Sequence, residues 1–526
     1  MVKVSSNPLC APRAPVVNFR GYRRTATSKL TQSANHSFSA LRARYGETYR
    51  WLLLLSVMVG TMASIMSSTI INVAIPDMSQ HFTLGQERAQ WVTSGFMVAM
   101  TVSMLSTPWL LARYGYRRTY SSCMWLLMAG GIAGGFANHF SLVLVARVAE
   151  GLAAGVVQPI PAIIILRIFE PHEQGRASGI FGMGVVLAPA IGPSIGGLLI
   201  DGFGWRSIFF MVVPFCLASL WLAQRFVPAT APGGGAANPQ GAGLDWRGLL
   251  LATMGTLCLL NGLVELRGGT PTLAMVLLVS AALILLCFVV LQRRTLTARH
   301  RHPDQGVDPL MNLLLFKDRR FAMGSIVAVI YGTALFGSTY LLPVYMQMGL
   351  QLSPSYVGTI LLPAGLVLAF TIAVVGRLSD KQPTHRLVSF GLLLLAASFA
   401  LMLTIDGRDL VRTTTLLVAW AILGRVGLGF ILPSLNTGAM RGLERHHIPQ
   451  GASAINFLRT LGGAAGVSLC GIVLEWRLEA HGALLATPGQ SPARLAAFDE
   501  TFLMLSILCA LAIISAWRLR AELTVD

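Results

Sequence analysis

One carboxylate stands deep inside a long apolar run and has a basic neighbour one helical turn before it. Of the 22 acidic residues, Glu150 alone lies well inside such a run, while the others lie in polar segments or near the ends of runs. Arg147 precedes it by three residues, so both side chains share one helix face. An ionisable group in an apolar run is costly to bury and marks a functional site by default. The pair predicts a group that binds and releases protons, and Gln158, eight residues further on, is expected to extend its polar face toward a cavity.

A purely structural interpretation of the same pair stays open. Arg147 and Glu150 could form a fixed ion pair that holds the helix and never exchanges a proton. Burial disfavours an ionised carboxyl group, whereas a guanidinium group beside it favours that form. The sequence alone does not weigh these two effects against each other.

Other polar side chains recur inside apolar runs at helical spacing. Arg425 and Asn436 are eleven residues apart, about three turns, and Asn456 and Arg459 are one turn apart. They could bind a substrate or act in gating, or they could simply form hydrogen bonds between helices. Methionine suits surfaces that bind varied ligands, but methionine and tyrosine at helical spacing fit a core equally. The candidate cavity residues are Met66, Asn72, Met97, Gln158, Tyr331, Tyr340, Arg425, Asn436, Asn456 and Arg459.

Apolar runs of membrane length must position these groups. The chain has 526 residues, of which 54% are hydrophobic and only 12% are charged, against about 25% charged residues in soluble domains. Runs of about 20 residues, each enough to cross a core of ~30 Å, predict an all-α polytopic membrane protein with fourteen spans. Their expected limits are 51–75, 89–111, 119–137, 141–166, 177–200, 206–226, 248–266, 271–292, 321–348, 355–376, 387–405, 413–440, 450–474 and 498–517.

The placement of basic residues sets the expected orientation. An even number of spans puts both termini on one side, where 30 of the 40 Lys and Arg residues then lie, against seven on the other side. Loops rich in Lys and Arg stay in the cytoplasm, so both termini are expected there. The net charge of +18 therefore needs no nucleic-acid partner. The seven cysteines lack metal-ligand spacing, and we expect no metal, cofactor or enzymatic site.

Composition divides the chain further. Residues 1–50 hold nine Lys or Arg and one acid, which predicts a disordered basic cytoplasmic tail, although a transit peptide has a similar composition. A Gly/Ala/Pro-rich segment predicts a flexible linker. The expected divisions are the tail 1–50, a six-helix bundle 51–226, the linker 227–247, two extra helices 248–292, a cytoplasmic loop 293–320, a second six-helix bundle 321–517 and a tail 518–526.

The fifth run carries glycine and proline at regular spacing. Small residues recur every four positions, at Gly184, Ala188, Gly192 and Gly196, and two prolines run beside them at the same spacing. In lipid, small residues let helices approach closely, and neighbouring helices tolerate the hydrogen bonds that proline removes. The run therefore predicts a packing surface with a bend. Its residues are Gly184, Pro189, Gly192, Pro193, Gly196 and Gly197.

Several segments carry a family resemblance when they are taken in order. They are STIINVAIP (68–76), WVTSGFMVA (91–99), GPSIGG (192–197), GWRSIFFMVVP (204–214), YLLPVYMQ (340–347) and QGASAINFLRTLGGAAG (450–466). Together they resemble the major facilitator superfamily, specifically its fourteen-helix drug:proton antiporter branch (EmrB/QacA-like). The resemblance covers about residues 51–520. It implies two six-helix bundles plus two extra central helices, with the fifth helix packed where the bundles meet and GPSIGG as the antiporter motif.

The resemblance also implies a function. It indicates a secondary transporter of the bacterial inner membrane that exports lipophilic or amphiphilic compounds in exchange for protons by alternating access. Its cytoplasmic gating motif falls on Arg113, Gly115 and Arg117 in the first half, and on Gly376 and Asp380 in the second. Relatives in two-membrane bacteria often work with a periplasmic adaptor and an outer-membrane channel.

This chain departs from the family pattern at positions that bear on coupling. Where the branch usually has an acid in its first helix, this chain has Ser67, and Glu150 stands where the family commonly has Gln. We therefore expect proton coupling at Glu150. With one acid left in the spans, we expect weakly cationic, neutral or zwitterionic substrates rather than dications. The alternatives are a dedicated metabolite exporter, a proton-independent facilitator and, more remotely, a membrane sensor or scaffold that transports nothing.

Overall fold

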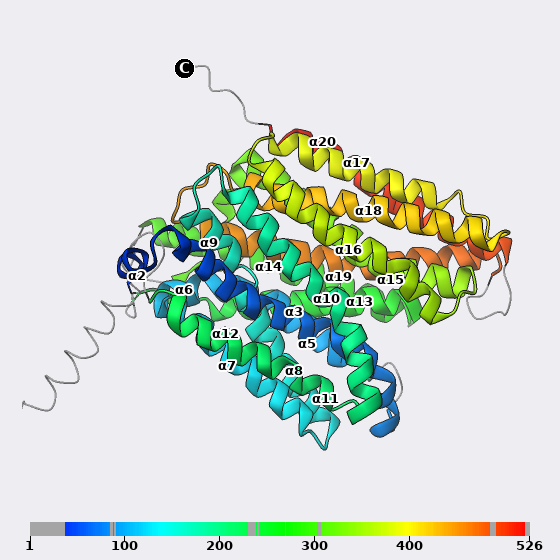
Figure 1. The fold of residues 1–526 in the computed structure, drawn as a ribbon, viewed down its shortest axis with the longest axis horizontal. Coiled ribbons are helices and arrows are strands. Elements are labelled where there is room, and N and C mark those ends of the chain that lie inside the picture. The colour runs from blue at the N-terminus through cyan, green and yellow to red at the C-terminus, as the bar shows by residue number, and fades with distance from the viewer. Residues whose placement is uncertain are drawn as a thin grey trace, which may run out of the picture.

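The computed structural model is built almost entirely of helices, which gather in two bundles (Figure 1). Helices up to Phe226, blue to green, form one bundle, and those from Leu313 onward, light green to red, form the other. The structure describes residues 37–84, 88, 91–229, 238, 241–268, 270–301, 307–483 and 491–520.

The first bundle contains helices that break where proline or glycine interrupts them. Pro159 separates α8 from α9, and Gly115, at φ 81°, ends α6 in a conformation that glycine adopts freely. The bundle consists of α3 (Tyr49–His81), α5 (Trp91–Ser103), η2 (Met104–Ser106), α6 (Thr107–Tyr114), α7 (Tyr116–Gly135), α8 (Phe140–Val157), α9 (Ile160–Ile168), α10 (Gln174–Phe203), α11 (Ser207–Phe210) and α12 (Val212–Phe226).

The second bundle has longer uninterrupted helices. Helix α15 packs along α19, and α18 packs between α16 and α17. Pro343 lies near the end of α15, which passes into a π-helical turn two residues later. The bundle consists of η3 (Leu313–Lys317), α15 (Arg319–Val344), η4 (Tyr345–Gly349), α16 (Pro354–Ser379), α17 (Thr384–Met402), α18 (Leu410–Gly438), α19 (Ile448–Ala480) and α20 (Pro492–Trp517).

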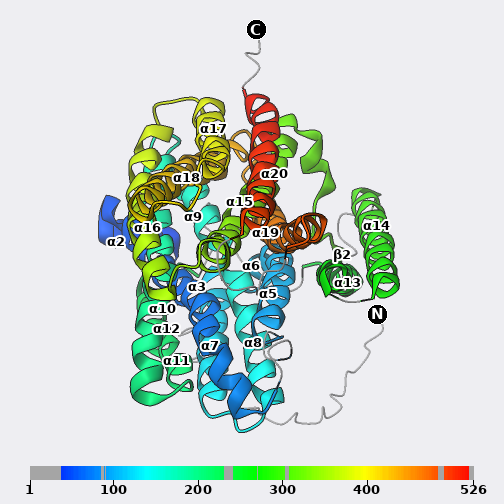
Figure 2. The ribbon, with the colours of Figure 1, turned by 90° about the vertical axis from the view of Figure 1, so that its right-hand side faces the viewer.

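Two further helices, α13 (Trp246–Gly268) and α14 (Pro271–Arg301), form a pair at the side of the bundles (Figure 2). Helix α13 contacts both α5 and α19. The pair exposes large apolar side chains such as Leu250, Val276 and Leu286, which suits contact with lipid. These helices are central in the sequence, but they lie at the periphery of the fold.

A short parallel strand pair joins the segments that flank this helix pair. β1 (Gly243–Leu244) pairs with β2 (Val307–Asp308). Asp245, next to β1, accepts hydrogen bonds from Gly248 N (2.8 Å) and Gln292 Nε2 (2.6 Å). Part of the linker expected to be flexible is therefore ordered, while the fold as a whole is all-α. Residues 230–237, 239–240 and 302–306 lie outside the described part of the chain.

Twelve of the described helices are long and apolar enough to cross a membrane. The sequence predicted fourteen such segments, and the two that are absent from the twelve are α7 and α10. Helix α7 has 20 residues and carries two arginines in its first turn, which lowers its hydropathy. Several side chains of α10 lie outside the described residues. Both helices still pack lengthwise on spanning helices, α7 on α8 and α10 on α3 and α16.

The expected disordered tail is wrong from residue 37 onward. Residues 1–36 lie outside the described part of the chain. After them Phe38–Tyr45 form α2, followed by the turn η1 (Gly46–Thr48). The Tyr45 ring packs edge-on against Phe226, with ring centres 5.5 Å apart. Apolar side chains that the basic composition masked therefore anchor this segment to the first bundle.

Candidate functional site

A carboxylate, a guanidinium group and a hydroxyl group meet inside the first bundle. Arg147 Nη1 donates a hydrogen bond of 2.5 Å to Glu150 Oε2. Ser67 Oγ, from α3, donates one of 3.1 Å to the same oxygen. Arg147 Nη1 also donates to Ser67 Oγ (2.8 Å) and to the Ser67 carbonyl oxygen (3.2 Å). Glu150 is 0% and Arg147 is 1% exposed, so the pair predicted from the sequence is formed and fully buried.

Glycines on α7 make room for this carboxyl group. A Cβ atom at Gly130 would lie 2.6 Å from Glu150 Cγ, and one at Gly131 would lie 3.4 Å from Glu150 Oε1. On the other side, the guanidinium carbon of Arg147 lies 4.2 Å from the centre of the Phe96 ring, which is a cation–π contact. Four helices, α3, α5, α7 and α8, therefore enclose the pair.

The enclosed pair keeps spare hydrogen-bonding capacity. Among the described residues, Glu150 Oε1 and Arg147 Nη2 have no hydrogen-bond partner. A cavity of about 10 Å³ is lined by Ser67, Arg147, Glu150 and Phe209, which is close to the least volume that one water needs. A buried carboxyl group with an unused oxygen beside such a cavity can accept a proton without breaking its bond to Arg147.

Glu150 and Gln158 face different spaces, contrary to the expected continuous polar face. Glu150 points toward α3 and α7 inside its own bundle. The Gln158 side chain instead accepts a hydrogen bond of 3.4 Å from Arg459 Nη2 in the second bundle. Eight residues turn a helix by about 800°, so the two positions lie about 80° apart around the axis.

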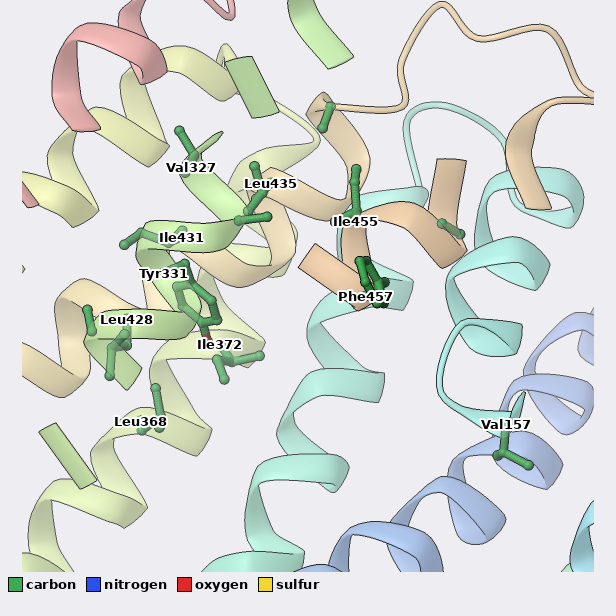
Figure 3. Packing of buried hydrophobic residues seen from close by; sticks show 14 of the residues in the cluster. Val157, Val327, Tyr331, Leu368, Ile372, Leu428, Ile431, Leu435, Ile455 and Phe457 are labelled. Atoms are coloured by element: carbon green, nitrogen blue, oxygen red, sulfur yellow. The ribbon is translucent and has the colours of Figure 1, made fainter. Parts of the chain in front are cut away.

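A second polar group lies where the two bundles meet. Arg459 Nη2 donates to Asn456 Oδ1 (2.7 Å) on the same helix as well as to Gln158. Tyr331 of α15 lies within electrostatic reach of both Arg459 and Arg425. Figure 3 shows the Tyr331 ring among apolar side chains of α16 and α18, including Ile372 and Leu428. Four predicted cavity residues are thus brought together here, from three helices of the second bundle, with Gln158 from the first.

The remaining predicted cavity residues are dispersed. Met66 is buried on α3, and Met97 packs on a small cluster that includes Phe96 and Met104. Tyr340 packs on the main core, and Asn436 is partly exposed on α18. Asn72 lies on α3, but its side chain is outside the described residues. The structure therefore gives Met66 and Met97 positions that suit core packing.

The glycine stripe of α10 packs on its own bundle. A Cβ atom at Gly184 would lie 2.6 Å from Met58 Sδ, and one at Gly196 would lie 2.6 Å from Ile70 Cγ1, both on α3. Gly192 likewise faces Thr69 of α3, whereas a Cβ at Gly197 would meet nothing within 4 Å. The side chains of Pro189 and Pro193 lie outside the described residues. The stripe is a packing surface, as predicted, but its partner is α3.

The face of α10 that meets the second bundle lies nearer its start. A Cβ atom at Gly179 would lie 2.8 Å from the Gly376 Cα atom of α16. At the end of α16, Asp380 accepts hydrogen bonds from the backbone N–H groups of Gly175 (2.6 Å) and Arg176 (2.8 Å). Burial raises the pKa of Asp380, although these two N–H groups oppose that shift. The second-half copy of the gating motif therefore caps a helix of the first bundle.

The first-half copy makes different contacts. Arg113 donates a hydrogen bond of 3.1 Å to the Gly241 carbonyl oxygen of the linker and lies over the Trp109 ring. Gly115 forms the turn between α6 and α7, and Arg117 is partly exposed at the start of α7. The side chain of Arg113 thus holds the linker to the first bundle.

Two contacts of arginines near the Asp380 end of the molecule were not predicted from the sequence. Arg167 donates to the Arg445 carbonyl oxygen of the second bundle at 2.8 Å through Nη2, and Arg50 pairs with Glu173 at 2.5 Å. They resemble ordinary loop charges in the sequence, and only the fold reveals their partners.

Among described residues, Glu444, His446 and His447 bring three metal-ligand atoms within 4.8 Å of one another, two of them on exposed side chains.

Replacing Asp380 with Asn should loosen the contact between the bundles at this end. Asn offers one neutral acceptor where the carboxylate offers two charged ones, so we expect a loss of about 1 kcal/mol and about fivefold faster amide exchange at Gly175 and Arg176. Hydrogen–deuterium exchange of the first turn of α10 measures this. The matched control is Asp318→Asn, since Asp318 caps its own helix, α15, at Arg320 N (2.7 Å). Equal exchange at α10 in both variants would contradict the assignment.

Two bundles of membrane-length helices, with a buried ion pair in one and a polar contact between them, define the architecture of a secondary transporter. The sequence model of the Major Facilitator Superfamily matches residues 57–467. The chain belongs to this superfamily and is a multi-pass membrane transporter rather than an enzyme.

Relatives from bacteria cover most of the chain. An uncharacterized MFS-type transporter, YhcA of Bacillus subtilis, is 28% identical over 85% of this chain and 81% of its own length. A multidrug resistance protein B homolog of Mycobacterium tuberculosis is 28% identical, covering 86% and 83% respectively. The riboflavin transporter RibZ of Clostridioides difficile is 26% identical, covering 80% and 87%.

Solved structures show the same fold. The proton:xylose symporter XylE, solved with a bromodeoxyglucose, superposes with a TM-score of 0.62 over 90% of this chain and 96% of its own. Its sequence identity is 11%, so the likeness concerns the fold alone.

Proposed function

We propose that this chain exports small lipophilic or amphiphilic compounds from the bacterial cell in exchange for protons. The observation that carries the proposal is the position of the Glu150 carboxyl group. Glu150 Oε2 lies 3.1 Å from Ser67 Oγ. An acid at position 67 of the first spanning helix would place its carboxyl group in the same region. In the proposed mechanism, Glu150 of the fourth spanning helix takes the role of the acid that the drug:proton antiporter branch usually has on its first helix.

The same site can couple two states by protonation. A ligand drives a conformational cycle only if it interacts differently with the two states. A proton on Glu150 removes the charge that Arg147 and Ser67 now bind, so it changes the contacts between α3 and α8. Glu150 lies ten residues from the start of α8, about 15 Å along the helix. In the proposed cycle it takes a proton from outside as the substrate leaves and releases that proton inward after the return.

The proposal includes the topology. We propose fourteen spans, with α7 and α10 in the membrane beside the helices they pack on, and both termini in the cytoplasm of the inner membrane. The relatives named for multidrug resistance support the fourteen-helix drug:proton antiporter branch and a contribution to antibiotic resistance. Docking of a periplasmic adaptor and an outer-membrane channel stays a prediction from the resemblance.

A second candidate is a dedicated metabolite exporter. The relative named as a riboflavin transporter favours it, because its identity to this chain is close to that of the multidrug relatives. A proton-independent facilitator would also fit the fold. These alternatives differ from the proposal in substrate range and in dependence on a proton gradient.

Purified protein in proteoliposomes tests the proposal. With an imposed pH difference of one unit, one-for-one exchange should drive about tenfold accumulation of an amphiphilic dye on the acidic side. Addition of a protonophore should collapse this accumulation to equality. Transport that continues unchanged without the gradient would identify a facilitator, and transport of one metabolite alone would identify a dedicated exporter.

A further inference from the structure

Two arginines near Tyr331, Arg425 and Arg459, have no carboxylate partner among the residues that the structure describes. Arg425 of α18 and Arg459 of α19 are both partly exposed although they lie in the middle of membrane-length helices. Among the described residues, no ion pair joins either of them to an acid, and the hydrogen bonds of Arg459 go to the neutral oxygens of Asn456 and Gln158.

Two other arginines that lie within membrane-length helices are neutralised by acids. Arg147 pairs with Glu150, and Arg477, near the far end of α19, pairs with Glu500 of α20. An unpaired charge inside a membrane is expensive and occurs where it faces a cavity or a ligand. Two unpaired guanidinium groups near one tyrosine are therefore a binding arrangement rather than a structural one.

The groups lie at a common depth. Tyr331 is twelve residues from the start of α15, Arg459 is eleven from the start of α19, and Arg425 is thirteen from the end of α18. At 1.5 Å per residue each lies roughly 16–20 Å from the same end of the molecule. The two arginines and Tyr331 thus lie at one level of the second bundle, where Arg459 reaches Gln158 of the first bundle.

We propose that Arg425 and Arg459 bind an anionic group of the transported compound, a carboxylate, with Tyr331 as an added hydrogen-bond donor. Guanidinium groups bind carboxylates through paired N–H donors. This inference rests on the proposed export function and names its substrate class as amphiphilic organic acids. It revises the expectation of weakly cationic, neutral or zwitterionic substrates, which followed from the single acid left in the spans.

Equilibrium binding of two matched dyes tests the inference. Fluorescein and a rhodamine methyl ester share a xanthene ring system, but the first carries a carboxylate and the second is a cation. We expect the purified protein to bind fluorescein more tightly. Arg425→Gln and Arg459→Gln should each weaken fluorescein binding about tenfold or more while leaving rhodamine binding within about twofold. Fluorescence polarisation measures both affinities.

Charge-retaining and matched control variants separate binding from folding. Arg425→Lys and Arg459→Lys keep the positive charge and should hold fluorescein affinity closer to the wild type than the Gln variants do. Arg477→Gln removes an arginine that already has a carboxylate partner and should leave both affinities unchanged. Thermal unfolding of each variant reports whether it is folded.

Several outcomes would overturn the inference. They are no fluorescein binding by the wild type, tighter binding of the rhodamine ester, or equal weakening of both dyes in the Gln variants. Because binding is measured without a gradient, the absence of proton coupling would defeat the proposed function and leave this result intact. Conversely, gradient-driven export of the rhodamine ester alone would uphold the export function and defeat the inference.

Discussion

Glu150→Gln should abolish accumulation driven by a pH gradient while the protein stays folded. Gln has nearly the same shape as Glu, and the family commonly has Gln at this position. It can still accept the hydrogen bonds from Arg147 Nη1 and Ser67 Oγ, which now measure 2.5 and 3.1 Å. It cannot bind and release a proton. Accumulation under a pH difference of one unit should fall from about tenfold to equality.

Proteoliposome transport with an imposed gradient measures this loss, and counterflow without a gradient serves as the internal control. Exchange of substrate for substrate needs no proton, so it should persist in the variant. Glu173→Gln is the matched control, since Glu173 also pairs with an arginine, Arg50, but at the end of the helices. Unchanged accumulation in Glu150→Gln would establish the fixed ion pair as the correct interpretation of Arg147 and Glu150.

The sequence predicts the helical elements well because burial in lipid imposes a simple rule. A run of about 20 apolar residues forms a helix, and nearly every predicted run corresponds to a helix of the structure. Helix α7, predicted as the run 119–137, has a low hydropathy because of its arginines and glycines, yet it packs as the spanning helices do. Gly130 and Gly131 of α7 leave room for the Glu150 side chain of α8. The pattern of residues along one helix does not reveal which side chain of another helix fills such a space.

Contacts between distant segments explain the other differences. The spacing of Arg147 and Glu150 predicts their pairing, because both lie on one helix. Their third partner, Ser67, lies 80 residues away, and only the family comparison drew attention to it. The stripe at Gly184 and Gly196 marks a packing surface, but the sequence does not say which helix covers it. Asp380 emerges as a cap of α10 only when the bundles meet.

Transfer of the acid from α8 back to α3 should restore coupling. In Ser67→Asp combined with Glu150→Gln, the new carboxylate would take the place of the Ser67 hydroxyl group, to which Arg147 Nη1 donates a hydrogen bond of 2.8 Å. The charge of the site is then the same as in the wild type, with the acid on the other helix. Accumulation under a pH difference of one unit should rise again from equality toward about tenfold.

The variant Ser67→Asp combined with Glu150→Gln tests whether coupling depends on where the acid lies, not only on whether an acid is present. Its control is Ser56→Asp combined with Glu150→Gln, because Ser56 is a buried serine on the same helix whose hydroxyl group donates to the Leu52 carbonyl oxygen, away from Arg147. That control should remain uncoupled or fail to fold, as thermal unfolding would show. If Ser67→Asp folds, binds substrate and still gives no accumulation, the carboxyl group must sit on α8 to couple. Protonation would then act by moving α8 itself, and the contact between α3 and α8 would be a consequence of that movement rather than its cause.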